Sequence, residues 1–368
     1  MRDLNKFKGC LIGGAVGDAL GYAVEFMPAS SIFEKYGADG ITEYELHNGI
    51  AEISDDTQMT LFTATGLLVG TTRGMTRGIM GDYAECYIAY SYRDWYRTQT
   101  ERYPLPKGHH YSWLVNLHEM FSRRAPGNTC LSAIARGGNG TIENPINQSK
   151  GCGGIMRVAP IGIYFADKAC PEEEIDAIGA RAAALTHGHE LGYIPAAMLV
   201  HILQRITDHK ESIYEAVQNA LTAIPALYPK SKHMQELISL MQKAVDLSKK
   251  QMDDFDAIRQ LGEGWVAEET LAIAVYCALK YHNEFEKGII ASVNHDGDSD
   301  STGAVTGNIL GALLGFDAIP KKFTDNLELK DVILEVAEDL CHDCKITEYG
   351  PLDNLWESKY IEMTYKRN

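Results

Sequence analysis

The sequence predicts a single all-α domain of 368 residues. Apolar residues recur at helical spacing in several long segments, as Met59, Phe62 and Leu67 do in "DDTQMTLFTATGLLVG". No segment alternates apolar and polar residues convincingly, and signals for β-hairpins are poor. The composition, 45% hydrophobic and 23% charged, is ordinary for a globular chain, and no stretch resembles a flexible linker.

Four segments illustrate how the helices are predicted in order along the chain: residues 55–70, 171–187, 267–280 and 329–343. The second has Pro171 at its first helical position, glutamates in its first turn and a histidine at its end, which matches the preferences of helix termini. Segments rich in glycine, proline and asparagine predict loops at residues 104–109, 124–128, 137–154 and 262–265.

Two further helices carry a glycine at every fourth position. The residues are Gly9, Gly13, Gly17 and Gly21 in the first, and Gly303, Gly307, Gly311 and Gly315 in the second. Each set would leave one helix face without side chains. A glycine inside a helix costs about 1 kcal/mol relative to alanine, so the repetition needs a structural reason. We expect both helices to be central and closely packed, and packing against each other is one arrangement that their bare faces allow.

The composition also limits the classes of partner that the protein can bind and indicates the compartment in which it is found. The net charge of −16 argues against broad binding to nucleic acid or anionic membranes, which requires a basic surface. The first residues lack a signal-peptide core, and no apolar run is long enough to span a bilayer. Eight scattered cysteines in a chain of this length suggest reduced thiols and a cytoplasmic location.

Two acidic clusters precede apolar helices. The first is Ser54, Asp55 and Asp56, and the second is Asp298, Asp300 and Ser301. Helix capping explains either cluster alone, because serine and aspartate are preferred caps. Two matching clusters favour hard oxygen ligands for Mg²⁺, Mn²⁺ or Ca²⁺. A calcium EF-hand fails at its sixth position, Ser301, and at its twelfth, Gly307, where glycine and glutamate are required.

Two more acids stand near the first glycine helix. Asp18 lies within that apolar helix, so we expect it to be buried and to make a structural polar contact. Glu25 is seven residues further on and lies on the same side if the helix continues that far. There it would reach from the helix end into a cleft.

Together these motifs resemble the ADP-ribosylglycohydrolase family. The resemblance rests on "GGAVGDALGYAVEF", "ISDDTQM", "KGCGGIMRVAPIG", "ALTHGHELGY" and "HDGDSDSTGAVTGNILGALLG" in this order. It implies a compact orthogonal helical bundle with two Mg²⁺ or Mn²⁺ ions at its centre. The ligands that it implies are Ser54, Asp55, Asp56, Asp298, Asp300 and Ser301. Asp296 falls outside the family's pattern and is expected to support the site from behind.

The resemblance also implies a substrate cradle. Its candidates are Gly127, Gly151, Gly153, Gly154, Ile155, Met156, His187 and Trp265. The glycines make physical sense because bare backbone N–H groups can approach phosphate oxygens closely. Each of these assignments has an alternative. The glycine loop could be a plain turn, and His187 could be a charge partner at a helix end. Trp265, a candidate neighbour of the adenine, could instead pack in the core.

The implied reaction is hydrolysis of the bond that joins ADP-ribose to a protein side chain, with arginine as the expected attachment point. Glu25, Asp55, Asp56 and Asp300 are the implied catalytic residues, and either Asp55 or Asp56 would accept a proton from water. A carboxylate at the entrance would suit a guanidinium, for which Asp94 is a candidate, although we expect Asp94 to be an exposed acid. The alternatives are hydrolysis of O-linked ADP-ribose and a non-enzymatic role like that of the family's crystallins. A monomer is expected.

Overall fold

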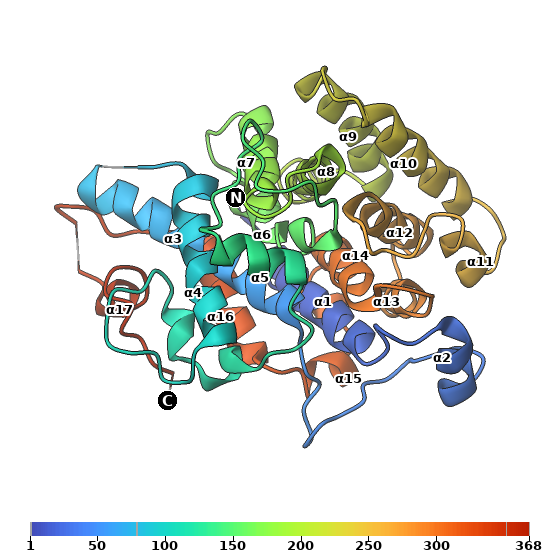
Figure 1. The fold of residues 1–368 in the computed structure, drawn as a ribbon, viewed down its shortest axis with the longest axis horizontal. Helices are drawn as coiled ribbons and strands as arrows, with labels where there is room; N and C mark the ends of the chain where they lie inside the picture. Colours follow the sequence, from blue (N-terminus) through green and yellow to red (C-terminus); the bar gives the residue numbers. More distant parts are fainter. Residues whose placement is uncertain (1, 79, 351, 368) are drawn as a thin grey trace.

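The computed structural model describes residues 2–78, 80–350 and 352–367, and these residues form 17 α-helices and no β-strand (Figure 1). The helices are α1 Leu4–Tyr22, α2 Ala29–Tyr36, α3 Asp55–Arg77, α4 Ala89–Thr100, α5 Asn128–Ala135, α6 Ala159–Tyr164, α7 Glu172–Ala184, α8 Glu190–Thr207, α9 Ile213–Leu227, α10 Met234–Ser248, α11 Asp254–Ile258, α12 Ala267–Lys280, α13 Phe285–Val293, α14 Ser299–Leu314, α15 Lys321–Thr324, α16 Lys330–His342 and α17 Asn354–Tyr360. The prediction of an all-helical fold is therefore confirmed.

Short turns of other helix types connect these elements. A π-helix, η1 (Tyr83–Ile88), leads directly into α4, and four 3₁₀ turns occur at η2 Trp113–Asn116, η3 His118–Phe121, η4 Cys152–Gly154 and η5 Phe316–Ala318. The four predicted helices correspond to α3, α7, α12 and α16. Pro171 is the N-cap of α7 rather than its first helical residue, so the helix begins one residue later than predicted.

The two glycine-bearing helices, α1 and α14, lie against each other at the centre of the molecule (Figure 1). A Cβ atom on Gly17 would stand 1.9 Å from the carbonyl oxygen of Gly303, and one on Gly307 would stand 1.9 Å from that of Gly13. The backbones thus touch directly, as the glycine spacing predicted. Gly315 departs from the prediction because it lies after the end of α14 as its C-cap, with φ of +83°.

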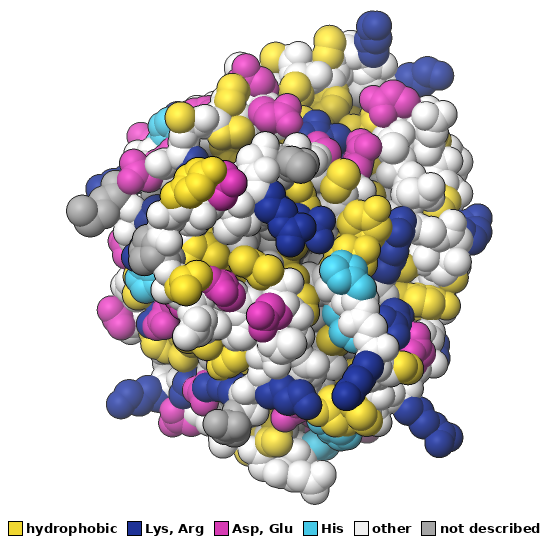
Figure 2. Space-filling model, turned by 90° about the vertical axis from the view of Figure 1, so that its left-hand side faces the viewer, with side chains coloured by type: hydrophobic (Ala, Val, Ile, Leu, Met, Phe, Trp, Pro, Cys, Tyr) yellow, Lys and Arg dark blue, Asp and Glu magenta, His cyan; other side chains and the backbone are white. Residues whose placement is uncertain are grey.

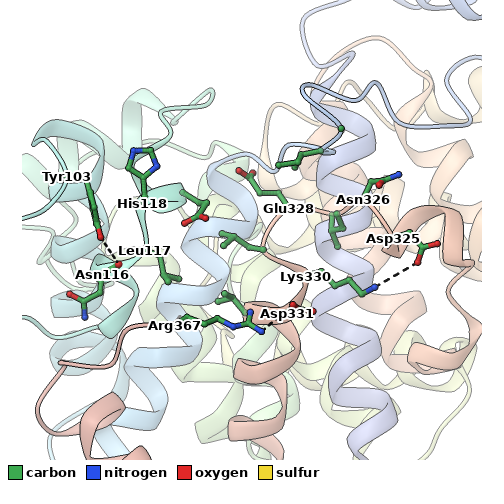
Figure 3. A pocket seen from close by; sticks show the side chains of 16 residues that line it. Tyr103, Asn116, Leu117, His118, Asp325, Asn326, Glu328, Lys330, Asp331 and Arg367 are labelled. Atoms are coloured by element: carbon green, nitrogen blue, oxygen red, sulfur yellow. Dashed lines mark hydrogen bonds and ion pairs between the residues drawn. The ribbon is translucent and has the colours of Figure 1, made fainter.

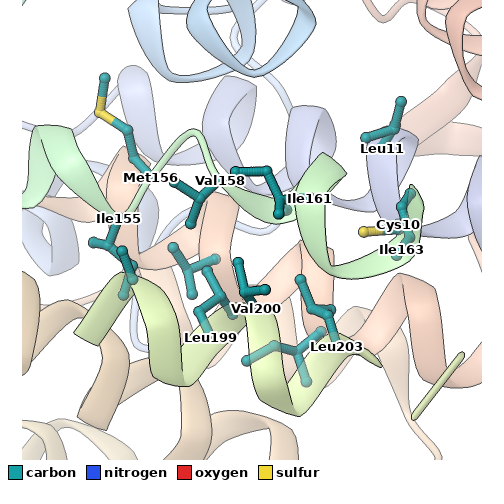
Figure 4. Packing of buried hydrophobic residues seen from close by; sticks show 14 of the residues in the cluster. Cys10, Leu11, Ile155, Met156, Val158, Ile161, Ile163, Leu199, Val200 and Leu203 are labelled. Carbon is teal, nitrogen blue, oxygen red and sulfur yellow. The ribbon is translucent and has the colours of Figure 1, made fainter. Parts of the chain in front are cut away.

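The core runs through the whole chain rather than through separate layers. In Figure 4, α6 lies between α8, which carries Val200 and Leu203, and α1, whose Cys10 lies beside Ile163. The helices α9, α10 and α11 lie at one end of the molecule, and α17 lies with the end of α3 at the other (Figure 1). The glycine pair therefore forms the axis around which the other helices pack.

The surface mixes charges despite the strongly negative net charge. Figure 2 shows Lys and Arg side chains interspersed with Asp and Glu on one face, with hydrophobic side chains between them. None of the described helices is both long and apolar enough to cross a membrane.

Candidate active site

Both acidic clusters lie at helix N-termini, where they also act as caps. Ser54 is the N-cap of α3, and its Oγ accepts a hydrogen bond from the N–H of Asp56 (3.2 Å). Asp298 is the N-cap of α14, and its Oδ1 accepts one from the N–H of Ser301 (3.2 Å). The two roles are compatible, because each cluster caps its helix and still places carboxylates at the same cavity.

Asp18 fixes the beginning of α3 from the middle of α1. It is fully buried, and its carboxylate accepts hydrogen bonds from the N–H of Ser54 (3.0 Å) and from the N–H and hydroxyl of Thr57 (3.1 Å to the N–H). The contact is the structural one that the sequence predicted. The backbone of α1 is also in direct contact with that of α14. The start of α3, held by Asp18, and the start of α14 are therefore both positioned by α1.

Three carboxylates from two distant parts of the chain converge here. Oxygen atoms of Glu25, Asp298 and Asp300 all lie within 4.8 Å of one another, and all three residues are buried. Asp55 and Asp56 line the same cavity. Glu25 does not lie on α1, which ends at Tyr22, but in the turn that follows. The structure therefore gathers the acids that the sequence singled out, with Glu25 delivered by a turn instead of a helix.

Burial and mutual repulsion change the ionisation of these acids. Burial, together with the charges of Asp298 and Asp55, raises the pKa of Glu25 to about 9. Burial raises the pKa of Asp55 to about 8, although its Oδ2 accepts a hydrogen bond from the N–H of Gly127 (3.1 Å). The pKa values of Asp56 and Asp300 are also raised, by burial first and by neighbouring carboxylates second.

The donor set suits divalent metal ions. Glu25 Oε2 and Asp56 Oδ1 are buried without a hydrogen-bond partner among the described residues. A buried carboxylate oxygen is rarely left unpaired, so each of these oxygens is open to a cation. The cluster offers carboxylates and serine hydroxyls, which are the hard oxygen ligands preferred by Mg²⁺ and Mn²⁺. A cation bound there would lower the pKa values of these carboxyl groups and keep them ionised.

The acids form the floor of a cavity of about 480 Å³. Gly127, Gly151, Gly153, Met156, His187 and Trp265 line its walls, together with Asp55, Asp56, Asp298, Asp300, Ser301 and Glu25. The glycine loop before α6 is pinned to the chain that carries Trp265, because the N–H of Cys152 donates to the Trp265 carbonyl (3.2 Å). The cavity thus places backbone amides of the loop beside the acidic floor.

Several predicted residues stand behind the cavity wall. Ser54, Gly154 and Ile155 are buried and do not line the cavity, so their roles in binding stay predictions. Asp296 accepts a hydrogen bond from the N–H of Ala29 (2.8 Å) and thereby holds the start of α2. That contact is consistent with the expected supporting role.

Three expectations differ from the structure. Asp94 is buried, not exposed, because its Oδ2 accepts hydrogen bonds from the N–H groups of Tyr111 and Ser112, and it does not line the cavity. Trp265 is not packed in the core: it is 39% exposed and stacks on Phe26, with ring centroids 6.1 Å apart. His187 is fully buried, and burial lowers its pKa to about 3, so it carries no charge to pair with a helix end.

Several residues that line the cavity are not among those predicted from the sequence, namely Phe26, Arg123, Ala125, Pro126, Asn128, Thr129, Cys130 and Cys152. Cys152 touches the acidic floor directly, since its thiol donates to Asp298 Oδ2 (2.7 Å). Phe26 follows Glu25 in the chain, and its adjacency was the one available signal. Arg123 and Thr129 lie in or beside a predicted loop and carry no pattern that would mark them.

A second and larger cavity, about 710 Å³, lies elsewhere and lacks this chemistry. Figure 3 shows its charged side chains engaged with one another, as in the pairs Lys330–Asp325 and Arg367–Asp331. Glu328, on the same wall, pairs with Arg124. Because these charges are satisfied within the protein, size alone does not make this cavity the functional one.

Comparison with known proteins agrees with the geometry. The sequence model of ADP-ribosylglycohydrolase matches residues 1–349. The chain is 22% identical to ADP-ribosylhydrolase ARH3 of Mus musculus, covering 89% of this chain and 88% of the relative. It is 26% identical to ADP-ribosylarginine hydrolase Tri1 of Serratia proteamaculans, covering 92% and 79%.

A solved structure described as an ADP-ribosylglycohydrolase-related protein complex shares the fold. The match has a TM-score of 0.59 at 22% identity and covers 92% of this chain and 98% of that one. The extent of the family match, joined to this helical framework, shows that the chain belongs to the ADP-ribosylglycohydrolase family.

Proposed function

We propose that this protein is a metal-dependent hydrolase that removes ADP-ribose from modified arginine side chains of proteins. The observation that carries the proposal is the buried cluster of Glu25, Asp298 and Asp300 at the floor of a cavity walled by a glycine loop. The Tri1 relatives, which are named ADP-ribosylarginine hydrolases, support arginine as the attachment point.

The proposed metal ligands are Ser54, Asp55, Asp56, Asp298, Asp300 and Ser301, holding two Mg²⁺ or Mn²⁺ ions. Ions bound there would supply Lewis-acid stabilisation to ribose oxygens and to the attacking water. Two chemically similar helix starts, α3 and α14, present these groups, and the contact between α1 and α14 keeps them in register.

The protein's own groups would act around the ribose. Cleavage of a glycosidic bond builds positive charge on the sugar ring, which nearby carboxylates stabilise. Glu25, with Oε2 free, would accept hydrogen bonds from the ribose hydroxyls. Asp55 and Asp56 are the two candidates to accept the proton of the attacking water, and Asp55 is oriented for this by the N–H of Gly127.

The rest of the cavity would hold the ADP part. The N–H of Gly153 would donate to the pyrophosphate, because those of Gly151 and Cys152 already donate to Ser149 Oγ and to the Trp265 carbonyl. The exposed faces of Trp265 and Phe26 at the cavity would stack on the adenine, since an aromatic face accepts any base.

The test is release of ADP-ribose from an arginine-modified and a serine-modified peptide, measured in parallel with Mg²⁺, with Mn²⁺ and with chelator. We expect metal-dependent release from the arginine-modified peptide. Release from the serine-modified peptide alone would move the proposal to the O-linked reaction, which the similarity to ARH3 makes the second candidate.

The metal mechanism has its own kinetic test. Asp55→Asn, Asp56→Asn and Asp300→Asn should each lower turnover by about 100-fold or more at saturating Mg²⁺, because each removes a carboxylate from the charge-stabilising floor. Near-normal turnover in all three variants would rule the metal mechanism out.

A further inference from the structure

Arg157 lies directly behind the cavity wall and is completely buried. It follows the glycine loop, in the segment between η4 and α6. Its Nη2 donates to Thr186 Oγ1 (2.6 Å) and to the Ala182 carbonyl (3.2 Å). Its Nη1 lies 3.4 Å from Cys130 Sγ, and the guanidinium stands 4.3 Å from the centre of the Tyr92 ring. All of these neighbours are neutral.

The guanidinium thus has no carboxylate partner. Arg157 forms no ion pair with any residue that the structure describes, and its Nε is buried without a hydrogen-bond acceptor. An arginine side chain keeps its positive charge inside proteins. A buried and unpaired charge is strongly unfavourable, so a chain that retains one needs a function for it.

Cys130 links this charge to the cavity. Its thiol touches Arg157 on one side, and the residue lines the cavity on the other. The pKa of Cys130 responds to both neighbours: Arg157 lowers it, and Asp55 and Asp56 raise it, under the larger effect of burial. The positive charge of Arg157 therefore reaches the cavity through a single layer of side chains.

Thr186 links the same charge to His187. The Thr186 hydroxyl accepts from Arg157, which can only donate, and it also hydrogen-bonds to His187 Nδ1 (2.8 Å). A Thr186 hydroxyl that donates to Nδ1 leaves the ring proton of His187 on Nε2. That atom faces the glycine loop: a Cβ placed on Gly151 or Gly153 would lie 3.4 Å or 3.3 Å from it.

We propose that Arg157 is a positioning residue for an anion subsite of the cavity. Through Thr186 it directs the Nε2–H of His187 at the loop Gly151–Gly153, and its own buried charge attracts the pyrophosphate bound there. The inference rests on the proposed function, and it adds to that function the residues behind the cavity wall, Arg157 and Thr186, that position the donor to the diphosphate group.

The first test is binding of ADP-ribose to the metal-free protein by calorimetry. Arg157→Met removes the charge and the donors, and its dissociation constant should rise on the order of tenfold, as expected for losing a unit charge roughly 10 Å away at an effective dielectric constant of about 20. Adenosine, which lacks the pyrophosphate, should bind Arg157→Met and the wild type alike. Arg157→Lys should restore part of the ADP-ribose affinity.

The second test addresses the relay. Thr186→Val should weaken ADP-ribose binding and Thr186→Ser should rescue it, because only the hydroxyl is needed. The double variant Arg157→Met/Thr186→Val should bind no more weakly than the weaker single variant, since both act along one chain of contacts. Nitrogen NMR of the wild type should show His187 protonated at Nε2, and Thr186→Val should lose this preference.

Two outcomes would overturn the inference. One is a folded Arg157→Met and a folded Thr186→Val that both bind ADP-ribose as tightly as the wild type does. The other is a wild-type His187 protonated at Nδ1. A wild-type protein that binds no ADP-ribose would instead defeat the proposed function, and the NMR measurement would still decide the relay.

Discussion

The Asp56 carboxylate has a buried oxygen, Oδ1, without a donor among the described residues, and its pKa is raised by burial and by Asp18, Asp55 and Asp298. Asp56→Asn should therefore leave the metal-free protein as stable as the wild type or more stable. It should also lose the stabilisation by metal that mass action predicts, about 2.7 kcal/mol at 100 times the dissociation constant. Thermal unfolding with and without Mn²⁺ measures both.

The matched control for that variant is Asp246→Asn. Asp246 is an exposed acid on α10 that accepts a hydrogen bond from Gln242, one turn earlier on the same helix. Its substitution should change stability by less than about 0.5 kcal/mol and keep the full response to Mn²⁺. A metal response that survives in Asp56→Asn would show that this carboxylate is not a ligand.

Trp265 presents an exposed ring face beside the cavity, stacked on Phe26. Trp265→Ala should weaken ADP-ribose binding by about 10-fold, because base stacking on an aromatic ring contributes roughly 1–3 kcal/mol. Tyr214→Ala removes a comparably exposed aromatic from α9, outside the cavity, and should not affect binding. Equal affinities of Trp265→Ala and the wild type would exclude adenine stacking on this ring.

A site residue can be recognised in the sequence when it lies in an element that imposes a regular spacing. The acids of α3 and α14 are recognisable because a helix start imposes spacing on them. Arg123, in a loop, and Thr129, in the first turn of α5, reach the cavity only through the tertiary packing of the chain, which local sequence does not record. Asp94 was misjudged for the same reason: its hydrogen-bond partners lie 17 and 18 residues downstream.

At the scale of the helices, the contact between α1 and α14 is the feature that the sequence predicts best. Glycine at every fourth position has few physical explanations other than close backbone approach. The end of α1 was less predictable. Residues 23–26 form a turn instead of continuing the helix, and this turn brings Glu25 to the acids of α14.

Gly303→Ala should disrupt this contact. Its new Cβ would lie 2.4 Å from the carbonyl oxygen of Gly17, a backbone atom that cannot rotate away. We expect the free energy of unfolding to fall by more than about 3 kcal/mol, at or beyond the upper end of overpacking effects. Urea unfolding measures the loss, and metal binding should weaken with it because Asp300 and Ser301 precede Gly303 on α14.

Gly74→Ala is the matched control on another helix. The nearest atom to its new Cβ would be the flexible side chain of Met80, at 3.1 Å. Alanine is the better helix former by about 1 kcal/mol, so stability should stay the same or rise. A Gly303→Ala protein as stable as Gly74→Ala would contradict the backbone contact.

At the scale of the whole molecule, the site depends on parts of the chain that are far apart in sequence. Residues of the N-terminal turn, the start of α3, the glycine loop and the start of α14 meet at one cavity. Helices on the periphery, such as α9 and α10, take no part in it. The all-helical class follows from local periodicity. The convergence of these four segments depends instead on tertiary packing, and the glycine faces of α1 and α14 are the main feature of the sequence that indicates it.

His187 makes the stability of the whole molecule depend on pH. Its pKa in the folded protein is about 3, against 6.5 ordinarily, mainly because of burial and secondly because of Arg157. Unfolding therefore lets the imidazole take up a proton at any pH between these values, so the contribution is unfavourable to folding below about pH 6.5 and vanishes above it. Through this residue, the free energy of unfolding decreases as the pH falls below about 6.5.

His187→Gln should remove that dependence. Between about pH 7.5 and about pH 5.5 the wild type should lose about 1 kcal/mol more stability than the variant, since linkage gives at most 1.36 kcal/mol per pH unit for one proton. Urea unfolding of both proteins in chelator at the two pH values measures the difference, and other titrating groups cancel between them. Parallel pH profiles would show that the imidazole is not held neutral, and a steeper loss in the variant would reverse the sign argued here.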